Sequence, residues 1–180
     1  MKFIRTPRRP ALKWIPENEW PDVCRSRSLT IQDHPQESLI GLAYNNENQV
    51  VQVTRNVHKL DFIYYVTLLE NPQTTKSLIS SRSHMTIEYT KTYHCNHKEV
   101  ATFTLLDVHV RKEGLGERNL LLEALINDVQ KRHLYYRISG DFEIVTHHGQ
   151  VSTDCFTRYG FQLHQNALIL QNFNAELFVT

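Results

Sequence analysis

Alternating apolar and polar side chains predict several β-strands in the middle of the chain. Val50–Thr54 and Phe62–Leu69 are short runs rich in β-branched and aromatic residues, which favour strands. Met85–Tyr93 alternates between the two kinds of side chain, and the polar turn Asn96–Lys98 leads from it into the apolar run Val100–Val110. We therefore expect these last two segments to pair as an antiparallel hairpin.

A helix is expected directly after this hairpin. From Glu117 to about Arg132 the apolar residues recur at helical spacing and form one stripe, which we interpret as core. The members of the stripe are Leu121, Leu122, Leu125, Ile126 and Val129. The polar residues that we expect mostly outside it are Glu123, Asn127, Asp128 and Lys131.

Shorter elements are predicted on both sides of this unit. Downstream, Phe142–Thr146 reads as a strand and a short helix follows it. A closing hairpin of Gly160–His164 and Ala167–Gln171 then ends the predicted order. Upstream, we expect a helix over Asn18–Ser26.

Two further segments lie between that helix and the first of the central strands. Leu29–Gln32 is predicted to be a brief strand. Glu37–Tyr44 is compatible with either a helix or a strand, because its apolar run is too short for its period to decide.

Composition is that of one ordinary globular domain. The 180 residues, 41% hydrophobic and 22% charged, are enough for a single domain spanning 1–180. The formal net charge of +1 gives no general nucleic-acid-binding signature. Residues 1–15 are the exception, since they hold five cations and no acid. We interpret them as a solvated basic arm, with contact to phosphate or RNA as the alternative.

Cysteine usage and hydropathy bear on the compartment. Cys24, Cys95 and Cys155 are odd in number and widely spaced, which argues against a disulfide framework and for a reducing compartment. Neither a bilayer-spanning apolar run nor a secretory signal is visible. We expect a cytoplasmic protein that does not insert into membranes.

A glycine-rich loop joins the long apolar strand to the helix. The run Arg111-Lys112-Glu113-Gly114-Leu115-Gly116 places two glycines directly before the expected helix start. Glycine adopts backbone angles that are closed to other residues, and the first turn of a helix has unpaired N–H groups that attract anions. The pattern therefore predicts a phosphate cradle. It lacks the Lys-Ser/Thr of a Walker loop and the third glycine of a dinucleotide fingerprint.

A second motif, Phe156-Thr157-Arg158-Tyr159-Gly160-Phe161, follows about 45 residues downstream. In this order the two motifs resemble those of the GNAT superfamily of acetyl-CoA-dependent N-acetyltransferases, over roughly residues 100–170. The resemblance implies an α/β (α+β) fold with a central mixed, mostly antiparallel sheet flanked by helices. It also implies a bulge that splays the strand before the loop from its parallel neighbour, with the pantetheine arm in the gap.

The same resemblance implies an activity, in which an acceptor amine directly attacks acetyl-CoA. The backbone of Val108 and Val110 would face the acetyl and pantetheine amides, the Val108 N–H would stabilise the oxyanion, and Arg111 to Glu117 would hold the pyrophosphate. The residues expected at the cofactor are Val108, His109, Val110, Arg111, Lys112, Glu113, Gly114, Leu115, Gly116 and Glu117. The acceptor would be a small molecule or a protein bearing a primary amine, and the enzyme a possible homodimer.

Two features depart from the family pattern. His109-Val110 leads directly into Arg111 without the proline that is usual there, which leaves the register of the bulge open. Phe156 stands where many members carry the tyrosine that protonates the departing thiolate. Candidate donors in its place are Tyr159, Ser152 and water, since a thiolate with a pKa of roughly 8.5 leaves comparatively easily.

The acceptor's ammonium must lose a proton before it attacks. Asp107 and His109 lie two residues apart on one face of the predicted strand, so that a carboxylate beside an imidazole can relay that proton. Glu143 is a second candidate base, on the strand after the helix. His147-His148 at the end of that strand either faces the acceptor cleft or is simply exposed to solvent.

Two other groups of reactive residues are expected to be structural. His94-Cys95-Asn96-His97 contains metal-ligand types, but no second pair of ligands accompanies it, so we expect a polar turn and no metal. Cys155 resembles a nucleophile for a two-step transfer, although the GNAT resemblance implies direct transfer. We therefore expect a buried structural thiol.

The sequence thus predicts an acetyl-CoA-dependent N-acetyltransferase. One alternative is a GNAT-like module that binds CoA but catalyses weakly or not at all, which Phe156 favours. A second is an acetyltransferase whose acceptor is associated with tRNA or the ribosome, which only the basic arm favours. The identity of the acceptor depends on the first hundred residues, where no motif is evident.

Overall fold

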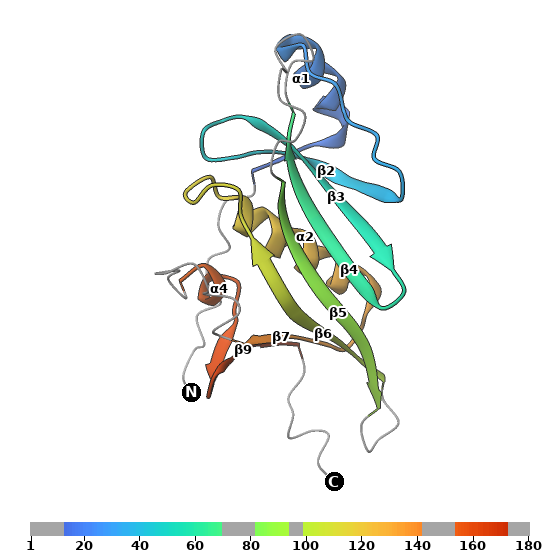
Figure 1. Ribbon diagram of the computed structural model, residues 1–180, viewed down its shortest axis with the longest axis vertical. Coiled ribbons are helices and arrows are strands. Elements are labelled where there is room, and N and C mark those ends of the chain that lie inside the picture. The colour runs from blue at the N-terminus through green and yellow to red at the C-terminus, as the bar shows by residue number, and fades with distance from the viewer. Residues whose placement is uncertain (1–12, 70–81, 94–98, 142–153, 173–180) are drawn as a thin grey trace.

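One continuous sheet forms the framework of the protein (Figure 1). The computed structural model describes residues 13–69, 82–93, 99–141 and 154–172. The strands are β1 (Trp14–Ile15), β2 (Glu37–Tyr44), β3 (Val50–His58), β4 (Asp61–Leu68), β5 (Ser83–Tyr93), β6 (Glu99–His109), β7 (Tyr136–Asp141), β8 (Gln162–His164) and β9 (Ala167–Gln171). The helical elements are the 3-10 turn η1 (Glu17–Glu19), α1 (Trp20–Arg27), α2 (Glu117–Arg132) and α4 (Asp154–Arg158).

The strand order is β1-β2-β3-β4-β5-β6-β7-β9-β8. Among the described strands, all neighbours are antiparallel except β6 and β7, which are parallel. Parallel neighbours need a crossover connection, and the 16-residue helix α2 lies between these two strands in the sequence. The described part of the chain is therefore a mixed α/β protein whose sheet is mostly antiparallel.

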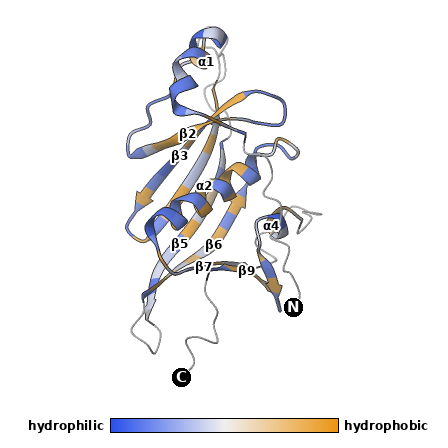
Figure 2. Cartoon of the chain, turned by 180° about the vertical axis from the view of Figure 1, so that it is seen from behind, coloured by the Kyte–Doolittle hydropathy of each residue, from blue (hydrophilic) through white to orange (hydrophobic). Residues whose placement is uncertain are grey.

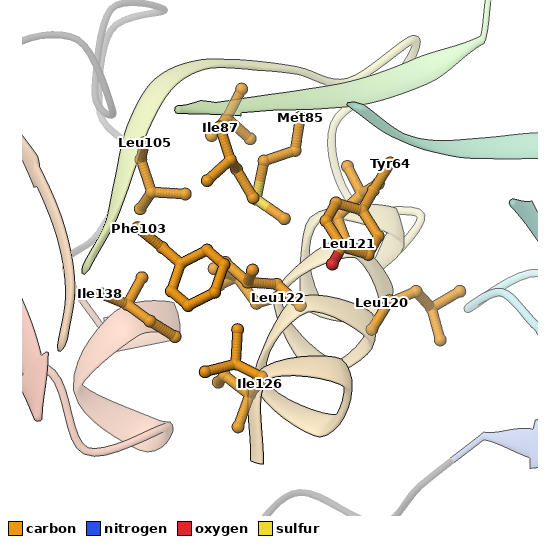
Figure 3. Close-up of a cluster of buried hydrophobic side chains, with 14 of the residues drawn as sticks. Tyr64, Met85, Ile87, Phe103, Leu105, Leu120, Leu121, Leu122, Ile126 and Ile138 are labelled. Atoms are coloured by element: carbon orange, nitrogen blue, oxygen red, sulfur yellow. The ribbon is translucent and has the colours of Figure 1, made fainter. Parts of the chain in front are cut away.

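The main core lies between the sheet and α2, which crosses the sheet in Figure 2. Tyr64, Met85 and Phe103 point from three neighbouring strands toward the helix (Figure 3). The predicted apolar stripe of α2 is buried at all five positions, which confirms it as core. Phe156 of α4 enters the same core and is fully buried.

A second, smaller cluster packs against α1. Leu42 and Val50 are buried there, with Trp20 of α1 beside them. Val50 and its neighbour Val51 belong to different clusters, and successive residues of a strand point to opposite faces. The two clusters therefore lie on opposite faces of the sheet.

Most expected elements are present. The helix spans Glu117–Arg132 as predicted, and β5 and β6 form the expected antiparallel hairpin. The closing hairpin is also confirmed, with β9 next to β7. The ambiguous segment Glu37–Tyr44 is a strand, because it pairs with β3 along its length.

Three segments differ from the sequence expectations. Leu29–Gln32 is not a strand: its Gln32 backbone donates to the side-chain oxygen of Gln52 at 2.9 Å and accepts from the side-chain nitrogen at 2.7 Å. The expected strand Phe142–Thr146 lies outside the described residues. The strand parallel to β6 is instead Tyr136–Asp141, which was not predicted.

Glu123 is buried, whereas the helical pattern placed it mostly outside the stripe. Trp14 Nε1 donates to its Oε2 at 2.8 Å, and the Tyr159 hydroxyl donates to its Oε1 at 2.7 Å. A buried carboxylate needs such donors to offset its lost hydration. These two bonds tie β1 and the residue after α4 to α2.

Candidate functional site

A β-bulge interrupts β6 shortly before the glycine loop. Thr86 of β5 lies opposite Asp107, but the next residue, Ile87, lies opposite Leu105. Leu106 is therefore the extra residue on β6. Pairing with β7 covers only Ala101 to Leu105, so β6 separates from its parallel neighbour at the bulge. The two strands diverge in Figure 1.

The glycine loop follows this separated end of β6 and leads into α2. Gly114 and Gly116 have φ of 85° and 76°, in the left-handed region that favours glycine, and Gly116 caps α2. Apart from the turn at Glu113–Gly114, the backbone N–H groups from Lys112 to Arg118 donate no hydrogen bond within the described residues. The loop therefore has the unpaired donors that an anion site requires.

The turn between β2 and β3 holds the loop from one side. Asn46 donates from Nδ2 to the Gly114 carbonyl at 2.6 Å and from its backbone to the Leu115 carbonyl at 2.8 Å. In a trans peptide the N–H points away from the carbonyl, so the N–H groups of Leu115 and Gly116 point away from Asn46. Lys13 Nζ in turn donates to the Asn46 side chain.

A cavity of about 180 Å³ opens at this loop. Its walls are the glycine loop, the first turn of α2, Asn46, and Cys155 of α4. Arg118 lines the cavity, and its Nε is buried without a hydrogen-bond partner among the described residues. A cation with an unused buried donor beside unpaired backbone N–H groups suits an anionic ligand.

The charges of the loop are largely paired within the protein. Arg111 binds the fully buried Glu117 at 2.6 Å, and Ser83 Oγ both donates to Glu117 and accepts from the Arg111 backbone. Lys112 binds Glu47 at 2.7 Å, and Arg118 binds Glu113 at 2.8 Å. The Arg111 side chain therefore braces the loop from within, and the backbone is left as the main anion donor.

A cluster of imidazole and carboxylate groups lies beside the bulge. His84 Nε2 is 3.1 Å from Asp107 Oδ2, and the rings of His84 and His109 lie 5.3 Å apart. Val108 and Met85 point into the core, so their neighbours Asp107, His109 and His84 lie on the face opposite α2. The structure thus brings together the two predicted residues and adds His84.

Sequence reasoning missed His84 because it considered each strand alone. The alternation along Met85–Tyr93 marked the inward side chains and gave no role to the residue before Met85. The usable signal was the expected hairpin, since its register sets His84 opposite His109.

A polar network borders this cluster. Arg82 binds Glu37 through two nitrogens at 2.8 and 2.6 Å and lies 4.0 Å from the centre of the Tyr65 ring. Burial by itself would raise the pKa of Glu37, but hydrogen bonds from Arg82 and Thr54 and the Arg82 charge outweigh it and lower that pKa. Glu37 is therefore charged, and its contacts with Arg82 and Thr54 are structural.

The short helix α4 and the residue after it place three candidate side chains in different surroundings. Phe156 packs edge to face against Phe161 in the core, so no hydroxyl lies at that position. The pKa of Tyr159 is raised by burial and by the hydrogen bond and charge of Glu123, so its proton is held firmly. Burial also raises the pKa of Cys155, although the Arg118 charge opposes this.

Several predicted residues cannot be placed. Ser152, Glu143, His147-His148 and the His94–His97 turn lie outside the described residues. Within the described ranges, no group of three or more His, Cys, Asp or Glu side chains is arranged to hold a metal ion. No helix in those ranges is long and apolar enough to cross a membrane.

Comparison with known proteins adds no relative: no family model matches the chain, and no curated protein sequence matches it. The class that the structure defines is a mixed α/β protein with a bulged strand, a glycine loop and a polar cluster at one end of a parallel strand pair.

Proposed function

We propose that the protein is a GNAT-like N-acetyltransferase that uses acetyl-CoA. One observation carries this proposal: β6 bulges at Leu106, leaves its parallel neighbour, and ends in a positive-φ glycine loop that caps α2. The GNAT resemblance implies this combination, with pantetheine between the separated strands and the pyrophosphate on the loop. The unpaired N–H groups and the cavity at Arg118 support the second half of that arrangement.

In the proposed reaction the acceptor nitrogen attacks the thioester carbonyl carbon, and the carbon–sulfur bond breaks to release the CoA thiolate. Asp107, held by His84, accepts the proton that the ammonium loses. The Val108 backbone N–H stabilises the developing oxyanion, as the resemblance implies. The proposed location for this chemistry is the end of β6 beyond the bulge.

Protonation of the thiolate has fewer candidates among the described residues. The Tyr159 hydroxyl donates a hydrogen bond to Glu123, and Phe156 has no hydroxyl. We therefore assign this step to water, with Ser152 as the alternative outside the described residues. Water suffices chemically, because a thiolate with a pKa of roughly 8.5 is a comparatively good leaving group.

A second candidate function is CoA binding without efficient transfer. It is favoured by the contacts at α4, where the ring of Phe156 is buried in the core and the Tyr159 hydroxyl is hydrogen-bonded to Glu123. In that case the loop binds CoA and the protein acts through a partner. The alternative of a tRNA-linked acceptor depends on the basic arm, most of which lies outside the described residues.

Calorimetry with two ligands tests the cofactor assignment. Acetyl-CoA is expected to bind, whereas acetyl-pantetheine, which lacks the pyrophosphate, should bind at least tenfold more weakly because it cannot use the loop. Gly114→Ala should weaken acetyl-CoA binding, since its new methyl group enters open space at the loop. Gly160→Ala is the matched control, because Gly160 has a similar φ of 90° away from the loop. The cofactor assignment would be wrong if the wild type bound both ligands equally well and the two variants bound acetyl-CoA equally well.

Transfer to a panel of primary amines then separates the two functions. The wild type should release CoA with at least one amine, and Asp107→Asn should slow that release with little change in acetyl-CoA affinity. Glu88→Gln, an exposed carboxylate on the neighbouring strand, serves as the control. Tight CoA binding with no transfer to any amine would favour the binding module.

A further inference from the structure

Four aromatic rings gather near the other end of α2 from the glycine loop. Phe62, Tyr89 and Phe103 come from three neighbouring strands, and His133 follows the last residue of the helix. In the pairs that contact one another, the ring centres lie between 5.1 and 6.1 Å apart, and each pair is edge to face or tilted. Such spacing is typical of stable aromatic contacts.

The rings do not fill the space between the sheet and the helix. A cavity of about 210 Å³ remains there, and Tyr64, Val129, Asp128 and Arg132 complete its walls. Phe103 and Tyr64 can be followed in Figure 3, where both reach from the sheet toward α2. This volume suits one six-membered ring with a short substituent, and the aromatic walls favour a flat apolar body.

An aromatic enclosure with a carboxylate at its edge resembles a site for a cation, but the charges here oppose that reading. Asp128 binds both Arg55 and Arg132 and also accepts from the Tyr64 hydroxyl. Two guanidinium groups therefore face one carboxylate. Arg55 does not line the cavity, so its wall carries one carboxylate, whose two oxygens are both occupied, and one guanidinium, that of Arg132.

His133 adds no positive charge of its own to the cavity. Burial lowers its pKa, and the nearby Arg132 charge lowers it further, so the ring is neutral at pH 7. A neutral imidazole offers a flat wall with one donor and one acceptor nitrogen, whereas Arg132 is half-exposed and retains donors beyond the one that binds Asp128.

We propose that this cavity binds a small planar aromatic acid, whose ring lies among Phe62, Tyr89 and Phe103 and whose carboxylate pairs with Arg132. The site is distinct from the proposed CoA loop, because it lies at the C-terminal end of α2 while the loop precedes its first residue. Occupancy of the cavity does not depend on whether the protein is an acetyltransferase.

Three probes of similar size and different charge test the proposal. Phenylacetate, phenylacetamide and phenethylammonium share a phenyl ring and two side-chain carbons, with charges of minus one, zero and plus one. Titrations followed by protein NMR are expected to rank them in that order, with phenylacetate roughly tenfold tighter than the amide because only it pairs with Arg132. Equal affinities, or tightest binding of the cation, would overturn the assignment.

Two variants locate the binding. Val129→Phe should fill the cavity and abolish binding of all three probes. Arg132→Gln, at a partly exposed position, should remove the preference for phenylacetate while leaving phenylacetamide unchanged. Lys131→Gln removes the neighbouring cation, which does not line this cavity, and should retain the preference. An equal loss of the preference for phenylacetate in the Arg132 and Lys131 variants would show a general charge effect and refute the proposed site.

Discussion

Gly114→Ala and Gly116→Ala add the same methyl group to one loop, but the two positions have different surroundings. Both residues have positive φ, so each alanine carries a backbone strain of about 1–2 kcal/mol. At Gly114 the new Cβ meets no atom within 4 Å. At Gly116 it would lie 2.9 Å from Asn46 Oδ1, so the Asn46 side chain must move.

That movement has its own cost. Asn46 would lose its 2.6 Å hydrogen bond to the Gly114 carbonyl, which contributes roughly 1 kcal/mol. We expect Gly114→Ala to lower the free energy of unfolding by about 1–2 kcal/mol and Gly116→Ala by about 2–3 kcal/mol. Urea unfolding followed by the fluorescence of the two tryptophans, Trp14 and Trp20, measures both values.

A double-mutant cycle isolates the contact. In an Asn46→Ala background the obstacle is gone, so Gly116→Ala should cost no more than Gly114→Ala does. A coupling energy near 1 kcal/mol is expected between positions 46 and 116. No coupling between Asn46 and Gly116, or equal costs for the two glycine variants in the wild-type background, would show that Asn46 does not support the loop.

Three other predictions concern the polar groups. Asp107→Asn should lower turnover roughly a hundredfold and remove the acidic limb of the rate profile, and an unchanged profile would exclude Asp107 as the base. Glu37→Gln should flatten the acid side of the stability curve. The lowered pKa of Glu37 gives stability that is present above its unfolded pKa of about 4.3 and is lost as pH falls through the folded value, so a wild-type curve in the variant would contradict this. Tyr159→Phe should destabilise the fold by about 1.5–3 kcal/mol, because the hydroxyl donates a hydrogen bond to Glu123. Turnover per folded molecule should not change, and a slowed reaction would restore Tyr159 as the proton donor.

Much of the fold could be predicted because its signals are local. The helix Glu117–Arg132 has a periodic apolar stripe and a glycine cap, and the β5–β6 hairpin has alternation on both strands. The strand β7 was missed even though Tyr136–Asp141 alternates inward and outward residues, because the run is short and its Ser139-Gly140-Asp141 end is typical of a turn. Its place is set by pairing with β6 on one side and β9 on the other, which a single-strand pattern does not contain.

The site could be predicted only in part, for the same physical reason. The glycine loop has a sequence signature, because the positive φ of Gly114 and Gly116 favours glycine. The partners that give this loop its shape have no such signature. Asn46, from the turn between β2 and β3, and Ser83, from β5, reach it through long-range hydrogen bonds, and their sequence surroundings mark only a turn and a strand.

These long-range contacts join the two halves of the chain at the proposed site. The recognisable motifs lie after residue 100, but Asn46 holds the loop carbonyls and His84 holds Asp107. Without those contacts the loop N–H groups would lose their common direction, and Asp107 would lose its neighbouring imidazole. Variation in the first hundred residues can therefore alter the geometry of the proposed cofactor site as well as that of the proposed acceptor site, although the motifs that suggest a cofactor lie downstream.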